Sequence, residues 1–247
     1  MLTIEQLKTI EQTPDEGDIS LKLLANFYEV YISNRIYELQ MEDGTILIFS
    51  AENRHFPHII GLHKFTDKRK EHKNRLLHYN KQLKCQKGFE NIKSSRITLE
   101  DLKNVGTKSK TYKRYKKRIL NFPFSYQLLR ESKFLSYDKD EVEKDTRING
   151  NYIFVNDINN DKLHFFFIDC YNNLMEEESS ETDAEDLVVP ITFIVTKKSD
   201  FNFVANQGIL KIRKVIIKDL DKSTILEEYD YGDMSECVVR KNNKSNS

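Results

Sequence analysis

The spacing of apolar residues changes along the chain, and this change limits the folds that the chain can adopt. Near the start, Leu21, Leu24 and Phe27 recur every three or four residues, which is the spacing of one face of a helix. The second half instead contains runs rich in Val, Ile and Phe, a composition typical of strands. These runs lie at 151–157, 162–171, 188–197 and 209–220. Helices and an early hairpin followed by a series of strands predict an α+β fold with one antiparallel sheet.

Local signals place the individual elements. Asp18 or Ser20 is a suitable N-cap for a helix over 18–34, and the Asp43-Gly44 pair predicts a hairpin between strands at 35–41 and 45–51. Further helices are expected at about 67–84, 97–102, 112–120 and 125–134, and a hairpin turn at 159–161. The strand at 209–220 changes phase at Arg213-Lys214, which predicts a β-bulge.

The charge of the chain is unevenly distributed. The totals balance, but 64–118 carries 19 Lys or Arg against five acids, a net charge of +14, whereas 171–190 carries seven acids and no base. We expect an N-terminal helical segment at 1–34, a main domain at 35–220 that contains the basic helical region 64–118 and the acidic loop 171–190, and a C-terminal tail at 221–247. The polar end of the tail, RKNNKSNS, is expected to be disordered.

Composition excludes several classes of protein. With 247 residues, 38% of them hydrophobic, the chain can form a sizeable core, but no apolar run approaches the roughly 20 residues of a membrane helix. The acidic, amphipathic start is unlike a signal peptide. Cys85, Cys170 and Cys237 are too scattered for a disulfide framework or a structural zinc site. We therefore expect a cytoplasmic protein with no membrane partner.

The basic region allows two interpretations. Runs of like charge are commonly no more than solvated helix faces. At 107–118, however, Tyr112 and Tyr115 alternate with cations, a mixture that can hold phosphates and stack on nucleobases. The cations that would bind nucleic acid there are Lys113, Arg114, Lys116, Lys117 and Arg118. The residues alone leave both interpretations open.

Three of the six histidines lie close together in the segment RHFPHIIGLHK. His58 lies three residues after His55, so that a helix would place both on one face, and His63 and Lys64 follow a glycine at which the chain turns. Histidine transfers protons near neutral pH, and an adjacent cation can stabilise charge on a phosphoryl group. A histidine beside apolar residues, such as His55, can equally be a packing residue. No further ligands accompany the pair, so no metal site is expected.

Other enzyme classes lack support in the sequence. No GxSxG, GxxxxGK[ST] or GxGxxG sequence is present, so the residues favour neither a triad hydrolase nor a P-loop or Rossmann enzyme.

The histidine segment belongs to a longer pattern. A strand hairpin leads into HxxHIIGLHK, followed by KRILNFPFSYQLL, NYIFVND and DKLHFFFID, then by PITF at 190–193 and a stretch with Gln207. From about Arg35 to Ile217, this pattern resembles the small phage- and prophage-borne proteins of the barnase–EndoU–colicin–RelE nuclease group. Two features depart from it: Thr192 stands where a serine is also expected, and the acidic insertion precedes that strand.

The resemblance implies a fold in which a helical N-terminal half packs on an antiparallel sheet of four strands or slightly more. It also implies a metal-independent endoribonuclease of the toxin type, without a cofactor, acting in conflicts between phages, mobile elements and hosts. It implies that His63 is the leading acid or base, that His58 is a second proton-transfer or orienting residue, and that Thr192 binds the scissile phosphate. Lys64 or Arg54 would hold phosphate, and His55 and Gln207 would contact substrate. The implied partners are RNA, including tRNA, and an antitoxin or a phage or host protein. Without the resemblance, Thr192 is an ordinary strand residue, and a non-catalytic module that binds nucleic acid or protein in phage defence or counter-defence is the alternative.

Overall fold

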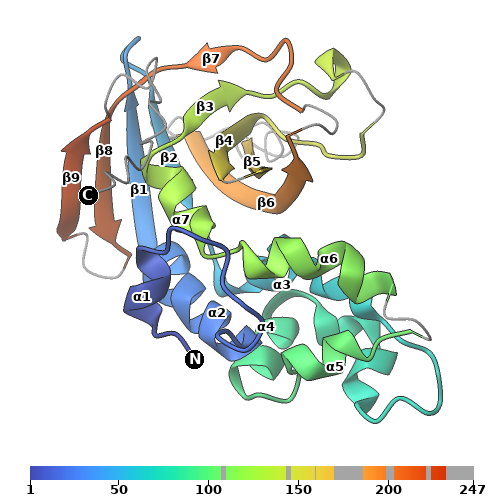
Figure 1. Ribbon diagram of the computed structural model, residues 1–247. Coiled ribbons are helices and arrows are strands. Elements are labelled where there is room, and N and C mark those ends of the chain that lie inside the picture. Colours follow the sequence, from blue (N-terminus) through green and yellow to red (C-terminus); the bar gives the residue numbers. More distant parts are fainter. Residues whose placement is uncertain are drawn as a thin grey trace, which may run out of the picture.

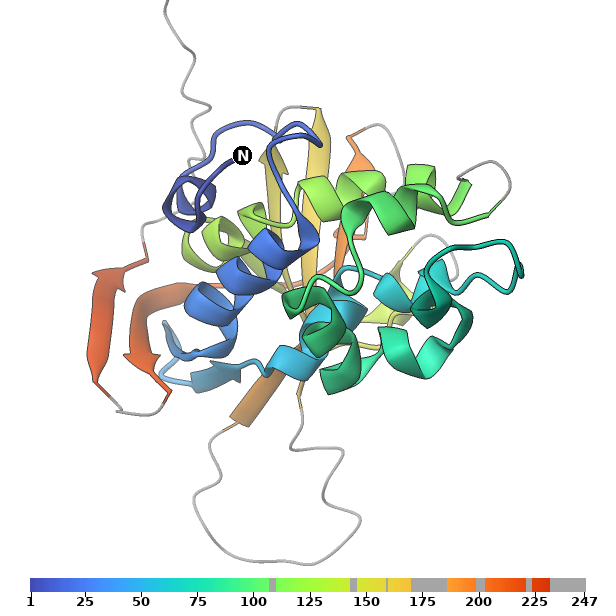
Figure 2. The same cartoon turned by 90° about the horizontal axis from the view of Figure 1, so that it is seen from below.

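The fold pairs one large sheet with a layer of helices. The computed structural model describes residues 1–106, 110–142, 146–158, 160–169, 186–198, 203–220 and 224–231. The sheet has nine strands in the order β7-β3-β4-β5-β6-β2-β1-β8-β9, and it curls strongly into a half-barrel. In the view of Figure 1 the helices lie below the sheet, and Figure 2, seen from below, shows the same helices in front of it. The predicted α+β class is confirmed.

The strands show that the predicted sheet was too small and too regular. They are β1 (Arg35–Met41), β2 (Ile46–Ser50), β3 (Lys133–Ser136), β4 (Tyr152–Ile158), β5 (Asp161–Asp169), β6 (Asp186–Lys197), β7 (Ile209–Leu210), β8 (Ile212–Asp219) and β9 (Ile225–Asp230). Seven pairs of neighbours are antiparallel, but β2 and β6 are parallel, with Leu47 opposite Asp186. The parallel pair arises because the chain leaves β2 through the helices and returns beside it only at β6, and a tight hairpin cannot make such a connection.

The helices are short. They are α1 (Ile4–Lys8), α2 (Leu21–Tyr28), α3 (Phe56–Ile59), α4 (Cys85–Lys93), α5 (Leu99–Lys103), α6 (Lys110–Leu120) and α7 (Phe124–Arg130), together with a π-helical turn at Glu29–Ser33. Ser20 caps α2 by accepting a hydrogen bond from the Leu23 amide, as its position predicts. The helices expected near 97–102, 112–120 and 125–134 are confirmed, although the last one ends at Arg130 and the chain then enters β3.

A bulge and a last strand complete the C-terminal half. Gln40 pairs with Lys214 and Met41 with Ile212, so that Arg213 is the extra residue of the predicted bulge. The expected tail at 221–247 includes β9, which pairs with β8. Residues 171–185 of the expected acidic loop lie outside the described residues, and residues 186–190 belong to β6. The RKNNKSNS end of the chain also lies outside the described residues.

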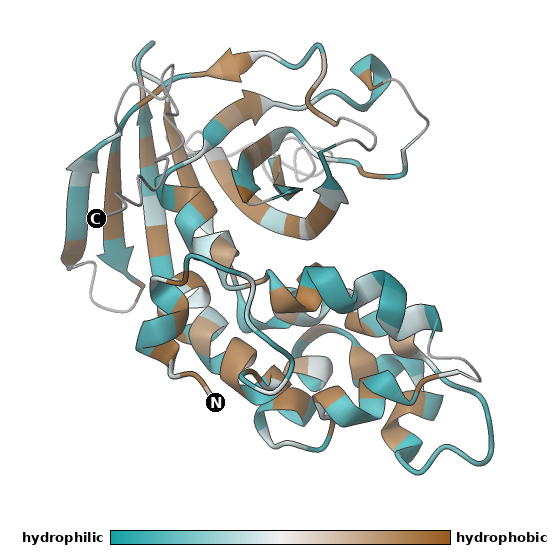
Figure 3. Ribbon diagram, in the orientation of Figure 1, coloured by the Kyte–Doolittle hydropathy of each residue, from teal (hydrophilic) through white to brown (hydrophobic). Residues whose placement is uncertain are grey.

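Two hydrophobic clusters lie on opposite faces of the sheet. The larger one joins the helices to the sheet and includes Phe154, Phe165 and Phe167. The smaller one contains Ile153 and Phe166, which alternate with those residues along β4 and β5. In Figure 3, hydrophobic residues are frequent in the central strands, whereas α6 is largely hydrophilic. In the described part of the chain, no helix has the length and apolar character needed to cross a membrane.

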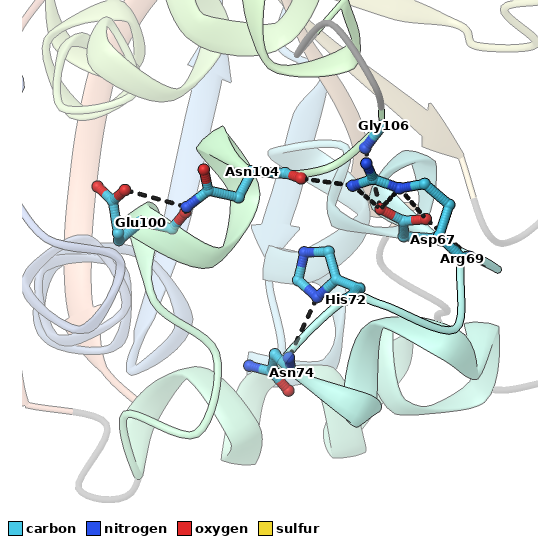
Figure 4. Close-up of polar contacts among 7 residues, drawn as sticks. All are labelled: Asp67, Arg69, His72, Asn74, Glu100, Asn104 and Gly106. Carbon is cyan, nitrogen blue, oxygen red and sulfur yellow. Dashed lines mark hydrogen bonds and ion pairs between the residues drawn. The ribbon is translucent and has the colours of Figure 1, made fainter.

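The helix predicted over 67–84 is wrong. The segment contains two short 3-10 turns, at Arg75–His78 and Asn80–Leu83, joined by irregular chain. Hydrogen bonds from side chains to the local backbone take the place of helical hydrogen bonds here. The side chain of Asn74 accepts a hydrogen bond from the Leu76 amide (3.1 Å), and Nδ1 of His72 accepts one from the Asn74 amide (3.1 Å), as Figure 4 shows for the second contact.

Asp67 ties the start of this segment to the end of α5. Its buried carboxylate accepts hydrogen bonds from the Arg69 guanidinium (2.8 Å) and from the Gly106 amide (2.9 Å), and Arg69 also donates to the Asn104 carbonyl (2.7 Å; Figure 4). The Arg69 guanidinium, above all, holds the pKa of the Asp67 carboxyl well below its usual range. These contacts hold the Lys-rich segment in one irregular path.

The buried His164 predicts a specific sensitivity to acid. It lies in β5, fully buried, with its ring centroid 6.2 Å from that of Phe166 and 5.2 Å from that of Phe203. Burial lowers the pKa of His164 to about 3, with a smaller contribution from Lys162 and an opposing one from the Ile194 backbone. The unfolded chain therefore binds a proton here below about pH 6.5 that the folded chain does not, and stability is lost as the pH falls through that range.

We expect His164→Phe to remove this proton-linked loss. Relative to the wild type, the variant should gain on the order of 2 kcal/mol in unfolding free energy between pH 7.5 and pH 5, since one pKa unit corresponds to about 1.4 kcal/mol. Urea denaturation at both pH values measures the gain. An equal pH dependence in the two proteins would contradict the role of His164.

Candidate active site

The turn after α3 brings two predicted histidines together. Pro57 occupies an early position of α3, where its missing amide costs no hydrogen bond, and Gly61 ends the helix with φ of +77°. A side chain at Gly61 would place its Cβ only 2.9 Å from Cδ1 of Tyr115, so glycine is required both by the backbone and by the packing against α6. Beyond this turn, the rings of His58 and His63 stack with centroids 4.7 Å apart and an angle of 7° between their planes.

Arg118 of α6 holds the same turn from the other side. Its Nε donates to the Ile59 carbonyl (2.6 Å), and its Nη2 donates to the His58 carbonyl (3.2 Å) and to the Thr192 hydroxyl (2.5 Å). Burial lowers the pKa of Arg118 to about 10, and the nearby Tyr115 opposes this shift. Among the described residues, no carboxylate forms an ion pair with Arg118, and its Nη1 donates no hydrogen bond. The guanidinium thus retains uncompensated charge beside the histidines.

Thr192 reaches Arg118 because β6 is irregular at this point. Phe166 of β5 pairs with Thr192, whereas Phe167 pairs with Pro190, so that Ile191 is an extra residue in the ladder. Such bulges bend a strand and change the direction of its side chains. The bulge adjoins the Thr192 hydroxyl that accepts from Arg118, and this contact connects the sheet to the turn that carries His58.

Three cations surround the histidine pair. Burial is the main cause that lowers the pKa of His63 to about 4, and His58, Lys64, Arg118 and Lys84 add to it. Burial also lowers the pKa of His58, with further contributions from Arg118, Lys64 and Lys84. Both rings are therefore neutral near pH 7, and Nδ1 of His63 is buried without a hydrogen-bond partner. Lys64 and Lys84 are exposed, so solvent reaches the cationic rim of the site.

His55 and Arg54 are engaged in contacts of their own. Nδ1 of His55 accepts a hydrogen bond from the Glu52 amide (3.1 Å), and burial lowers the pKa of His55. Arg54 forms an exposed ion pair with the Glu52 carboxylate (2.6 Å). His55 therefore has the backbone contact of a packing residue, and Arg54 would have to leave Glu52 in order to hold a phosphate.

The predicted nucleic-acid cations separate into two groups. Lys116 forms an ion pair with Glu16, and Lys117 forms one with Asp161 (2.7 Å). Lys113 and Arg114 are exposed and form no ion pair within the described ranges of the chain. Of the five predicted cations, Lys113 and Arg114 are therefore the exposed ones without an ion pair in the described part of the chain, while Arg118 holds the turn that carries His58.

Gln207 lies away from this group. Its side-chain amide donates to the Asp138 carbonyl (2.9 Å) and accepts from the Asp138 amide (2.7 Å). It precedes β7, which is separated from β6 by β3, β4 and β5 in the sheet. The structure therefore gives Gln207 a role in fixing the loop around Asp138 and does not bring it to the histidines.

Lys84 is a site residue that the sequence did not reveal. It immediately precedes α4, and α4 packs on α3 so closely that a Cβ at Gly88 would lie 3.0 Å from Cγ of Pro57. In sequence, Lys84 is one of many lysines in the basic region, and only the packing of α4 on α3 selects it.

Comparison with known proteins does not identify the chain. No protein-family model, no curated protein and no solved structure matches it. Within the described residues, no group of three or more His, Cys, Asp or Glu side chains could hold a metal ion. The case for a function therefore rests on the geometry and charge of the cluster formed by His58, His63, Lys64, Lys84, Arg118 and Thr192, which we call the histidine site.

Proposed function

We propose that this chain is an endoribonuclease that cleaves RNA at the histidine site without a metal ion. The observation that carries the proposal is Arg118. A partly buried guanidinium with no carboxylate partner in the described structure lies beside two stacked histidines and within their electrostatic reach. A buried cation is normally paired, and the missing counter-charge is an anion such as a phosphate.

The chemistry of the proposed reaction fits the residues at hand. His63, neutral near pH 7 because its pKa is lowered, would accept the proton of the ribose 2′-hydroxyl as the oxygen attacks the adjacent phosphorus. The bond from phosphorus to the 5′-oxygen would break, leaving a 2′,3′-cyclic phosphate, and the leaving 5′-oxygen would take a proton from the solvent. Arg118, Lys64 and Lys84 would stabilise the charge on the phosphoryl oxygens.

Thr192 would support the phosphate from the sheet. Its oxygen already accepts from Arg118, so its own hydroxyl proton remains to be donated. Thr192 would thus hold Arg118 in place and donate to a phosphoryl oxygen. Lys113 and Arg114, uncompensated on α6, would contact more distant phosphates of the RNA.

The test of this function is direct. Purified protein is incubated with total RNA and with a tRNA pool in the presence of EDTA. The expected result is cleavage that leaves 2′,3′-cyclic phosphate ends. Intact RNA after incubation with correctly folded protein, as judged by circular dichroism, would overturn the proposal.

One observation favours a second function. Both histidines of the pair have lowered pKa values, so the free site offers a base near pH 7 but no protonated acid. A module that binds nucleic acid or protein without cleaving it needs no acid. In that case RNA would bind but stay intact, and binding to phosphates would weaken steeply with salt, whereas contact with a specific protein partner would not follow that slope.

A further inference from the structure

The three cations of the histidine site carry more positive charge than one singly charged phosphate oxygen can balance. Lys64 follows His63 directly, and Lys84 before α4 and Arg118 of α6 both act electrostatically on the two rings. The site thus combines three cations from three separate elements around one pair of rings. A ligand with two negative charges is the simplest partner for such an arrangement.

The charged groups that face the pair can be named element by element. The turn Leu62–Phe65 contributes Lys64, the start of α4 contributes Lys84, and α6 contributes Arg118. On the other side, the exposed ion pair between Glu52 and Arg54 lies beside His55 and adds no net charge, and β6 contributes only the neutral Thr192. Carboxylates are absent from the groups that act most strongly on His58 and His63 in the described structure.

The geometry limits how many protons the pair can hold. The two rings stack in parallel with centroids 4.7 Å apart, so two imidazolium charges would face each other directly. In the free protein the three cations oppose even the first proton. An anion seated among the cations cancels their repulsion, and Nδ1 of His63, which has no partner, is the buried atom that can take a proton.

We propose that the stacked His58–His63 pair binds a dianion, a phosphate or sulfate group, together with one proton from the solvent. The proposal rests on the proposed function, because it assigns the same site to phosphate. It also supplies what the free site lacks: with an anion bound, one ring carries a proton and can serve as the acid, while the other stays neutral and can serve as the base.

Sulfate is the probe of choice because it stays dianionic over the range in which histidine titrates, whereas inorganic phosphate gains and loses a proton itself. The Cε1–H resonances of the histidines are followed by NMR between pH 4 and pH 8, in sodium sulfate and in sodium chloride of equal ionic strength. His58→Gln and His63→Gln assign the two resonances. The resonance of His164, buried in β5, is the internal control.

We expect sulfate to raise the pKa of one ring of the pair by at least about one unit and to leave His164 unchanged, since the anion favours the charged form of the nearby ring only. The affinity for sulfate should rise at least roughly twofold from pH 7 to pH 5, because binding takes up a proton. Lys84→Met should reduce both effects. Lys22→Met, which removes an exposed lysine of α2, should reduce neither.

The proposal is overturned if the titration of both rings is the same in sulfate and chloride, or if sulfate affinity does not depend on pH. The cleavage assay in EDTA is separate. Proton-linked sulfate binding without RNA cleavage would reject the nuclease but keep the anion site. RNA cleavage without proton-linked sulfate binding would reject the anion site but keep the nuclease.

Discussion

His63→Ala should lower the rate of RNA cleavage by about a thousandfold, because proton transfer by a positioned side chain contributes roughly 10² to 10⁴ in rate. His63 is the central candidate because it combines a lowered pKa with an unpartnered Nδ1 and direct stacking on His58. The measurement is the initial rate of cleavage of a labelled RNA in EDTA. The melting temperature should change by only a few degrees, since the side chain is half-exposed and makes no hydrogen bond from Nδ1.

His78→Ala is the matched control for this experiment. His78 is also a half-buried histidine with an unpartnered ring nitrogen, but it lies in the turn Arg75–His78 beside His72, and it does not appear among the groups that act on His63. The rate of RNA cleavage by His78→Ala should stay within about twofold of that of the wild type. Undiminished cleavage by His63→Ala would reject the assignment of the site, and an equal loss in both variants would point to a change of stability instead.

The residues that the sequence identified well are those with local causes. The glycine at which the chain was expected to turn is Gly61, whose φ is +77°, and the bulge at Arg213 follows from the phase of neighbouring side chains. His58 and His63 flank that turn, so their proximity follows from a segment of six residues. Such features depend little on the rest of the chain.

The parts that the sequence did not reveal depend on contacts between distant segments. Arg118 appeared as one cation of a basic run, but its contacts with Ile59 and Thr192 join residues that are 59 and 74 positions away. Lys84 belongs to the site only because α4 packs against Pro57. The parallel pairing of β2 and β6 likewise leaves no periodic signal in either strand. Tertiary packing determines these features, and a pattern within one segment cannot express it.

The irregular path of 67–84 has another cause. Its lysines are compatible with a solvated helix, and the sequence favoured that interpretation. The carboxylate of Asp67 and the side chain of Asn74 instead form hydrogen bonds with nearby backbone amides. Short polar side chains compete with helical hydrogen bonds in this way, and the competition is decided here by the contact of Asp67 with Gly106, which is 39 residues away.

Phe122→Ala should produce the largest loss of stability among the substitutions considered, about 3 to 5 kcal/mol in unfolding free energy. Phe122 is fully buried, and its ring lies 5.2 Å from that of Phe56, 5.9 Å from that of Phe193 and 6.1 Å from that of Tyr28, measured between centroids. It therefore connects α2, α3 and β6 at one point. Truncation leaves a cavity between elements that cannot close together without moving the sheet or the helices. Urea denaturation at pH 7.5 measures the loss.

The same substitution should disturb the histidine site, because two of the rings that contact Phe122 lie close to site residues along the chain. Phe56 lies two residues before His58 on α3, and Phe193 follows Thr192 on β6. We expect cleavage by Phe122→Ala to fall further than the fraction of unfolded protein explains, since Arg118 must reach both elements at once. Phe122→Leu is the control: it keeps most of the volume and should cost about 1 to 2 kcal/mol with little loss of rate. A loss below about 1 kcal/mol for Phe122→Ala would mean that the helices and the sheet do not share this packing point.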